Sequence, residues 1–302
     1  MSKELSPSTD RAYGVKMVCD AWDIPRSSFY NQHSSKPQTD EEPPPKKKRG
    51  PKPKISDEER LELIKQDVEE SSFIGEGHRK VWARFYYDKK IKVAKKRVLR
   101  IMRESNLLSP YRVPQAPARE HTGRITTDEP NVMWGTDGAK VFTLEEGWGW
   151  IFVNVEHWNA EVLGWHVCKK GNRFAALEPV SQGVLKEFGS VEAGIVRGLV
   201  LMLRMDSGPQ YRSDDFLNQV KAWGIAPSFS FVSEPQTNGV SERFIRTLKE
   251  QVIYGRTFRT IEEVRQAVAK FIPLYNNEWR LEKNGYLSPI QMRKAYYERM
   301  AA

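Results

Sequence analysis

The chain has little cysteine and no long apolar run, and each shortage argues against a class of protein. Its 302 residues include two cysteines, Cys19 and Cys168, and no CxxC pair, so a disulfide framework and a cysteine-based zinc site are disfavoured and a reducing compartment is expected. No apolar stretch approaches the roughly 20 residues that a membrane span requires. The first ten residues also lack the apolar core of a secretory signal. We therefore expect a cytoplasmic protein with no membrane association.

Positive charge, in contrast, is abundant and concentrated in the middle of the chain. The formal net charge is +9; residues 44–124 hold 22 Lys or Arg against 11 Asp or Glu, whereas residues 125–302 hold 21 of each. A concentrated basic segment is the electrostatic footprint of a protein that binds a polyanion. A solvated face that only keeps the protein soluble would have the same composition, so charge alone does not decide between the two.

The first third of the chain predicts a short helical segment and a basic linker. Residues 1–35 indicate two short helices with a break at AWDIP, and Arg26, near the start of the second, is a candidate DNA contact if the pair is a helix-turn-helix. A helical hairpin that packs on another element is an equal alternative. Residues 36–55 are rich in proline and lysine, and KKKRGPKPK, which includes Arg49, could lie along phosphates or remain a solvated linker.

Residues 56–109 predict a helical DNA-binding domain of three helices. Ser56 and Glu59 form a capping box at its start. The third helix, KVAKKRVLRIMRES, carries four cations at helical spacing on one face: Lys92, Lys96, Arg100 and Arg103. Such a face suits contact with phosphates, and an exposed helix in solvent usually mixes its charges more evenly, so we prefer DNA binding for this helix. Residues 110–128 follow as a second linker.

From residue 129 the pattern changes to strands and helices. Three successive strand candidates rich in valine, isoleucine and aromatic residues precede alternating helices and strands, which indicates an α/β domain with a mixed sheet over residues 129–255. Residues 256–302 predict a helical extension. Its first helix, over 260–276, would pack in the core or on a partner subunit, and the core is preferred.

Three acidic residues lie where their elements could bring them to one edge of the sheet. Asp137 is on the first strand, Asp206 ends the fourth, and Glu242 is near the start of a helix. Converging carboxylates raise one another's pKa unless divalent cations occupy the site, and hard oxygen ligands suit Mg²⁺ or Mn²⁺. Two such ions can clamp a phosphodiester. Taken singly, each acid is more simply a turn or helix-start residue, and Glu156 is a rival ligand.

The spacing of these acids resembles a known signature. Thirty-five residues separate Asp206 from Glu242, and Lys249 follows seven residues later, as in the Asp, Asp-35-Glu pattern of insertion-sequence transposases and retroviral integrases. The blocks WGTD, MDSGPQY, PQTNGVSERFIRTLK and YNNEWRLEKNGYLSPIQ resemble those of OrfB-type transposases of bacterial insertion sequences, which are members of the DDE superfamily. The resemblance covers residues 56–295 well and residues 10–35 weakly.

This resemblance implies an α/β RNase H-like catalytic domain, a mixed sheet with flanking helices, preceded by small all-α helix-turn-helix modules. It implies a transposase that binds two Mg²⁺ ions, with Mn²⁺ as a substitute, through Asp137, Asp206 and Glu242. Such an enzyme cleaves DNA at element ends and transfers the 3′-OH to target DNA. It would act as a homo-oligomer, alone or with an upstream-frame partner or fusion, in the bacterial nucleoid. From their spacing, Arg246 and Lys249 share the face of Glu242 and are expected to contact DNA.

Some features depart from the family pattern, and two other functions stay open. Gly138 and Ala139 follow Asp137 where the family commonly has a bulkier pair, and Ser207 follows Asp206 where Asn or Arg is more usual. The His/Cys zinc module of retroviral integrases has no counterpart in the sequence. A non-catalytic regulator derived from a transposase would keep the basic helices and lose the three acids. An RNase H-fold nuclease would cleave without joining strands.

Overall fold

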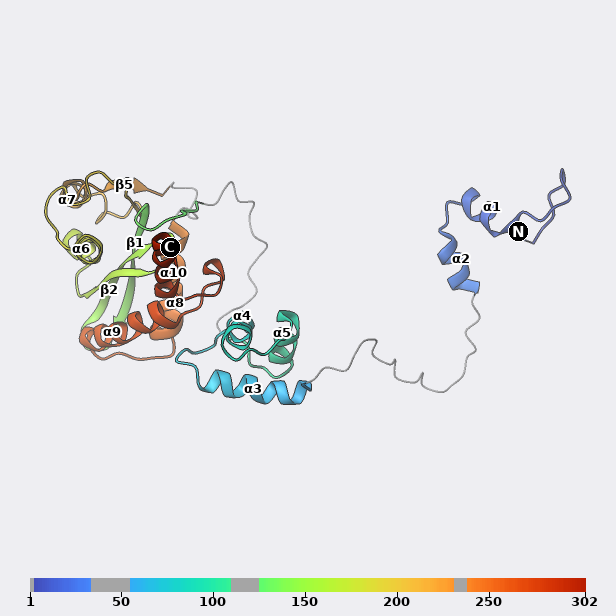
Figure 1. Cartoon of the computed structure of the whole chain (residues 1–302), viewed down its shortest axis with the longest axis horizontal. Helices are drawn as coiled ribbons and strands as arrows, with labels where there is room; N and C mark the ends of the chain where they lie inside the picture. Colours follow the sequence, from blue (N-terminus) through green and yellow to red (C-terminus); the bar gives the residue numbers. More distant parts are fainter. Residues whose placement is uncertain (1–2, 34–54, 110–124, 231–237) are drawn as a thin grey trace. The chain divides into compact units, whose positions relative to one another are not determined.

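The computed structural model describes residues 3–33, 55–109, 125–230 and 238–302 (Figure 1). Its contacts divide the chain into two units, residues 1–54 and residues 55–302. In the described part of the first unit, α1 (Gly14–Ala21) and α2 (Arg26–His33) are the two predicted helices. Cys19 is the one buried residue there, so the pair has almost no core of its own.

The second unit begins with the predicted helical domain. It contains α3 (Asp57–Glu69), α4 (His78–Ala83), the π-helical turn η1 (Arg84–Asp88) and α5 (Lys95–Glu104). Ser56 and Glu59 form the predicted capping box, with the Glu59 amide donating to the Ser56 hydroxyl and the Ser56 amide donating to the Glu59 carboxylate. The core consists of apolar side chains from all four elements: Ile64, Val81, Phe85, Val98, Ile101 and Met102.

A five-stranded mixed sheet organises the rest of the unit. Its strands are β1 (Met133–Thr143), β2 (Gly147–Glu156), β3 (Val162–Cys168), β4 (Met202–Met205) and β5 (Ala226–Phe229), in the order β3-β2-β1-β4-β5. The first three strands are antiparallel neighbours, and β4 and β5 run parallel to β1. The prediction of an α/β domain with a mixed sheet is confirmed, and the order and directions are the RNase H-like arrangement that the resemblance implies.

Helices cover both faces of this sheet (Figure 1). One face packs against α6 (Arg173–Phe188) and α7 (Asp214–Trp223), which join Trp134, Phe152 and Leu203 in one core. The other face packs against α8 (Gly239–Leu248), the π-helical turn η3 (Lys249–Ile253) and α9 (Ile261–Glu278). The α9 side chains Val264, Val268 and Ile272 are buried in that core, so the prediction that this helix packs in the core is confirmed.

The block YNNEWRLEKNGYLSPIQ connects the carboxyl-terminal helices to the sheet. It contains the end of α9, the 3₁₀ turn η4 (Glu282–Asn284) and the start of α10 (Pro289–Ala301). The buried Asn276 side chain bonds both backbone groups of Val162, accepting from its N–H and donating to its C=O at 2.9 Å each. Asn284 donates to the carbonyl of Asn159, whose own side chain donates to the carbonyl of Pro289. This block therefore has a structural role in fixing the turn before β3.

Adjacent asparagines in this block allow a matched stability test. Asn276→Ala removes both bonds to the start of β3 and leaves buried backbone groups unpaired, so it should lower the free energy of unfolding by about 2 kcal/mol. The exposed Asn277 side chain donates to the Pro273 carbonyl within its own helix, so Asn277→Ala should change stability by less than about 0.5 kcal/mol. Urea unfolding of both variants measures the difference, and equal effects would contradict the structural role.

The connection between α3 and α4 inserts a side chain into the core of the sheet domain. Phe73 is buried there and meets Phe271 and Trp279 edge to face at centroid distances of 6.4 and 4.8 Å. The next residue, Ile74, exchanges two hydrogen bonds with the side chain of Gln251 in η3, at 2.9 and 2.7 Å. The helical domain therefore shares a core with the sheet domain. Among the described helices, none is long and apolar enough to cross a membrane.

Candidate active site

The pairing of β1 with β4 brings two of the predicted acids to the same level. The parallel register aligns Met133 with Met202 and Gly135 with Arg204. Two residues beyond the last pair, the chain carries Asp137 on β1 and Asp206 just after β4. Because neighbouring strands lie ~4.8 Å apart, these carboxylates emerge side by side at the carboxyl end of β4.

A glycine amide orients each aspartate. The Gly138 N–H donates to Asp137 Oδ1 at 2.7 Å, and the Gly208 N–H donates to Asp206 Oδ1 at 2.8 Å. The second bond closes a turn in DSGPQY. Asp206 is therefore a turn residue, as its sequence context predicts, and the same carboxylate can still take part in a metal site. Gly138 also explains one departure from the family pattern, because a Cβ there would meet the ring of Phe152 at 2.7 Å.

A close contact between β1 and α8 brings the third acid beside the first. Gly135 packs against the buried Ser241, and a Cβ on Gly135 would overlap the Ser241 hydroxyl. The neighbouring Asn238 side chain donates to the carbonyl of Thr136 at 3.2 Å. Glu242 follows Ser241 in the first turn of α8. Glycine at 135 therefore lets the amino-terminal end of α8 approach β1 next to Asp137.

The three carboxylates interact electrostatically. Burial is the main cause that raises the pKa of Asp137 to about 7, and the negative charges of Asp206 and Glu242 raise it further. The Gly138 amide and the positive charge of Lys249 lower the pKa of Asp137 and so oppose this shift. Burial and the charge of Asp206 also raise the pKa of Glu242. Acids from a strand, a turn and a helix therefore lie close enough for their charges to act on one another, and together they form an acidic cluster.

The chemistry of this cluster suits a hard divalent cation, although its side chains are not arranged as a complete metal site. Within the described ranges, no three His, Cys, Asp or Glu side chains are positioned to hold a metal ion together. The donors are nevertheless all carboxylate oxygens, which Mg²⁺ and Mn²⁺ prefer, and their mutual repulsion is what a cation would relieve. Glu242 is exposed at the start of its helix, so its side chain has rotameric freedom to adjust.

The two cations predicted on the Glu242 face differ in their surroundings. Lys249 is half-buried at the start of η3, and its charge acts on Asp137. Arg246 donates through Nε to the buried carboxylate of Glu250 at 2.9 Å. Lys249 is therefore close enough to the acidic cluster for its charge to act on Asp137, whereas Arg246 forms an ion pair with Glu250.

The predicted basic face of α5 is smaller than its sequence spacing indicates. Lys92 precedes the helix, which begins at Lys95, so the prediction that all four cations lie on one helix face is wrong for Lys92. Arg100 donates to Asp57 at 2.5 Å and also pairs with Glu104. Lys96 and Arg103 are exposed and form no ion pair within the described residues. Arg26 is exposed at the start of α2, and Arg49 lies outside the described residues.

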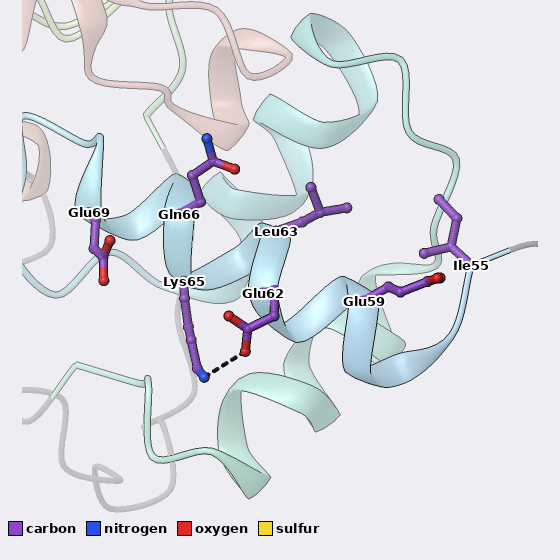
Figure 2. A pocket seen from close by; sticks show the side chains of 7 residues that line it. All are labelled: Ile55, Glu59, Glu62, Leu63, Lys65, Gln66 and Glu69. Carbon is purple, nitrogen blue, oxygen red and sulfur yellow. Dashed lines mark hydrogen bonds and ion pairs between the residues drawn. The ribbon is translucent and has the colours of Figure 1, made fainter.

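A pocket along α3 carries net negative charge. Figure 2 shows its lining, in which Lys65 bonds Glu62 at 2.8 Å; the lining residues are Ile55, Glu59, Glu62, Leu63, Lys65, Gln66 and Glu69. Three glutamates around a single lysine repel phosphates, so this side of the helical domain is a poor surface for DNA.

Two residues near the acids have roles that the sequence left open or missed. Glu156, the rival ligand, is buried; its two oxygens accept hydrogen bonds from the amides of Asn131 and Trp158, which favours a structural role. Tyr211, in the MDSGPQY block, is fully buried, and burial together with Asp137 and Asp206 raises the pKa of its hydroxyl. No sequence feature distinguished Tyr211 from an ordinary core tyrosine.

Comparisons with known proteins find similarity to transposases and integrases. A family model described as an integrase core domain matches residues 223–289. The InsD transposases for insertion element IS2 of Escherichia coli are 29% identical to this chain in a 185-residue match that covers 59% of this chain and 60% of the relative. The chain thus spans three fifths of the length of the curated relatives it matches. The resemblance to DDE transposases predicted from the sequence is confirmed.

Several solved structures of retroviral integrases are also similar. The catalytic core domain of HTLV-2 integrase, solved with magnesium, is 16% identical with a TM-score of 0.39, and the match covers 54% of this chain and 96% of that one. The intasome of simian T-cell lymphotropic virus is 15% identical with a TM-score of 0.43, over 77% of this chain and 73% of that one. The strand order and directions, rather than these superpositions, support the RNase H-like fold.

Proposed function

We propose that this chain is a DDE transposase that cleaves DNA at the ends of a mobile element and joins the resulting 3′-OH to target DNA. The observation that carries this proposal is the acidic cluster: Asp137, Asp206 and Glu242 come from three separate elements, and their charges interact. The likeness to the IS2 transposases supports the same activity. A regulator that had lost catalysis would have no need of all three acids.

The proposed mechanism consists of two phosphoryl transfers. The three carboxylates would hold Mg²⁺, or Mn²⁺ in its place, and the bound ions would stabilise charge on the attacking and leaving oxygens. In the first transfer, a water oxygen attacks phosphorus at the element end and the bond to the 3′ oxygen breaks, leaving a 3′-OH and a 5′-phosphate. In the second, that 3′-OH attacks a target phosphodiester and displaces another 3′-OH. The glycine amides at Asp137 and Asp206 would keep both carboxylates oriented throughout.

The remaining basic residues would hold the DNA. Lys249 would contact the backbone near the scissile phosphate, with Arg246 at the edge of the same surface. Lys96, Arg103 and Arg100 on α5, together with Lys92, Arg26 and Arg49, would contact phosphates of the element end. Two element ends must be held for joining, so we propose a homo-oligomer on DNA, with or without an upstream-frame partner or fusion.

Lys249→Ala should weaken binding to duplex element ends by removing one phosphate contact. The slope of the logarithm of the binding constant against the logarithm of salt concentration should fall by about one. Lys294→Ala is the matched control, because Lys294 lies on α10 outside the proposed DNA surface and should leave the slope unchanged. Fluorescence anisotropy across a salt series measures both, and an unchanged slope for Lys249→Ala would remove this residue from the DNA surface.

The proposed function is tested by strand joining. Labelled duplexes with the element's terminal repeats are incubated with protein, Mg²⁺ and a supercoiled target plasmid, and EDTA serves as the control. A transposase yields a cut strand with a 3′-OH and label transferred to the plasmid. Cleavage without transfer would indicate an RNase H-fold nuclease. Binding without either reaction would indicate the regulator, and restoration of chemistry by an upstream-frame product would identify the required partner.

A further inference from the structure

The end of the β1–β2 hairpin exposes two aromatic rings. Phe142 is 52% exposed and Trp148 is 59% exposed, and their rings meet edge to face at 5.4 Å. The antiparallel register pairs these two residues across the strands. Large aromatic rings are unfavourable when exposed to water, so two adjacent exposed rings indicate a surface that binds a ligand or a partner.

Lysines lie near these rings. The next pair on the same face is Lys140 with Trp150, and the Lys140 ammonium lies 5.2 Å from the centre of the Trp150 ring. Lys169 and Lys170 directly follow β3, whose last residue pairs with Trp150. We call this set the hairpin surface: Lys140, Phe142, Trp148, Trp150, Lys169 and Lys170.

The positive charge of the hairpin surface is not neutralised locally. Lys140, Lys169 and Lys170 are exposed and form no ion pair with the residues that the structure describes. The two acids of the hairpin turn have other partners: Glu145 binds the guanidinium of Arg259, and Glu146 accepts the amide of Ile261 at 2.5 Å. The surface therefore combines cations with aromatic faces.

An open strand edge leads from the acidic cluster to the hairpin surface. β4 pairs with β1 only from Met133 to Gly135, whereas β2 pairs with β1 as far as Thr143. Beyond Gly135, no described strand pairs with β1 on the side of β4. Phe142 lies five residues past Asp137, ~17 Å along an extended strand, and this odd spacing places the two side chains on opposite faces of the sheet. A DNA strand that runs from Asp137 to Phe142 would therefore pass over this open edge of β1, a path of at least about five nucleotide steps of a stacked strand.

We propose that the hairpin surface binds an unpaired DNA strand that extends from the active site. Bases would stack on Phe142 and Trp148 while the lysines contact phosphates, which is the combination used for single strands. Paired bases hide their faces inside the duplex, so duplex DNA would use the lysines and leave the rings exposed. A second copy of this chain is a poorer occupant, because a self-complementary interface would bring like-charged lysines together. The proposal rests on the proposed function, which supplies the strand.

Tailed duplexes test this surface directly. Binding of the full chain to an element-end duplex with a ten-nucleotide single-stranded tail is compared with binding to the blunt duplex, by anisotropy in EDTA so that no strand is cut. The wild type should prefer the tailed duplex, with the preference appearing only in tails longer than about five nucleotides. Trp148→Ala and Phe142→Ala should each lower that preference by about tenfold and leave blunt binding unchanged.

Two control variants separate stacking from general disturbance. Trp148→Phe retains a ring and should keep most of the tail preference. Tyr297→Ala removes a ring that is 50% exposed on α10 and should change nothing. The proposal is overturned if the wild type shows no tail preference, or if both alanine variants keep it. It is also overturned if Trp148→Ala changes the sedimentation coefficient while tail preference persists, because the rings would then form a contact between copies.

The joining assay on the same preparations separates this proposal from the proposed function. Joining by a protein without tail preference would leave the transposase assignment in place and reject the hairpin surface. Tail preference that depends on Trp148 in a protein without metal-dependent chemistry would retain the surface and reject the transposase assignment. A protein that binds neither duplex would reject both.

Discussion

Asp206→Asn should remove strand cleavage while leaving binding to duplex element ends intact. The asparagine carbonyl can still accept the Gly208 amide, so the turn is preserved, but the negative charge that would help to hold a cation is lost. The cleavage rate should fall on the order of 10²–10³-fold or more, the range seen when one preorganised charge-stabilising group is removed. Single-turnover cleavage and anisotropy on the same duplex measure chemistry and binding separately.

Parallel substitutions make this prediction specific to the cluster. Asp137→Asn and Glu242→Gln should have the same effect as Asp206→Asn, because each removes one charge from the same site. Asp214→Asn is the control, since Asp214 is exposed in the first turn of α7 and has the ordinary role of a helix-start acid. Near wild-type cleavage in any of the three cluster variants would exclude that residue from the site.

Gly135→Ala should also slow cleavage strongly, although Gly135 itself contacts neither the DNA nor the metal in the proposed site. The new Cβ would overlap the Ser241 hydroxyl, and α8 must move away from β1 to accommodate it. Glu242 would move with the helix. A displacement of about 1 Å at a catalytic group can cost on the order of 10²-fold in rate. Cleavage kinetics measure the loss, and urea unfolding tests whether the fold survives.

A compensating substitution separates displacement from general damage. Ser241 Oγ is buried without a hydrogen-bond partner among the described residues, so Ser241→Ala alone should be well tolerated. In the double variant the overlap with the Ser241 hydroxyl is gone. The methyl group at position 135 would then meet Asn238 Oδ1 at 3.0 Å, which needs a small adjustment, and the Cβ at position 241 at 3.6 Å, an ordinary contact. Most of the cleavage rate should therefore return. A double variant as inactive as Gly135→Ala would contradict the positioning role of this contact.

The sequence predicts the elements of this protein better than their contacts. The strands, the helices around them and the capping box at Ser56 all follow from local periodicity and turn chemistry, and each is present. The spacing of Asp137, Asp206 and Glu242 matches the transposase signature, so the sequence predicts that these three acids form one site. Its geometry depends on the β1–β4 register and on the Gly135–Ser241 contact, which join residues far apart in the sequence and leave no local pattern.

The spacing of charged residues is a poor predictor of which cations are available to bind DNA. Arg246 and Arg100 both lie on predicted basic faces, yet Arg246 pairs with Glu250 and Arg100 pairs with Asp57 from another helix. Helical spacing shows which side chains share a face, but a tertiary partner decides whether their charge is available to DNA. Phe73 illustrates the same limit for packing, because a single aromatic residue in a connection does not indicate which core it enters.

Binding of Mn²⁺ to the complex of protein and element-end DNA would show whether three carboxylates from separate elements form one metal-binding centre. Electron paramagnetic resonance distinguishes bound from free Mn²⁺, and cleavage is blocked by a DNA strand with a non-hydrolysable linkage. A shared centre should bind Mn²⁺ in the wild type, bind it more weakly in Asp137→Asn, Asp206→Asn and Glu242→Gln alike, and keep it in Asp214→Asn. Equal Mn²⁺ binding in the wild type and all three cluster variants would contradict a shared centre.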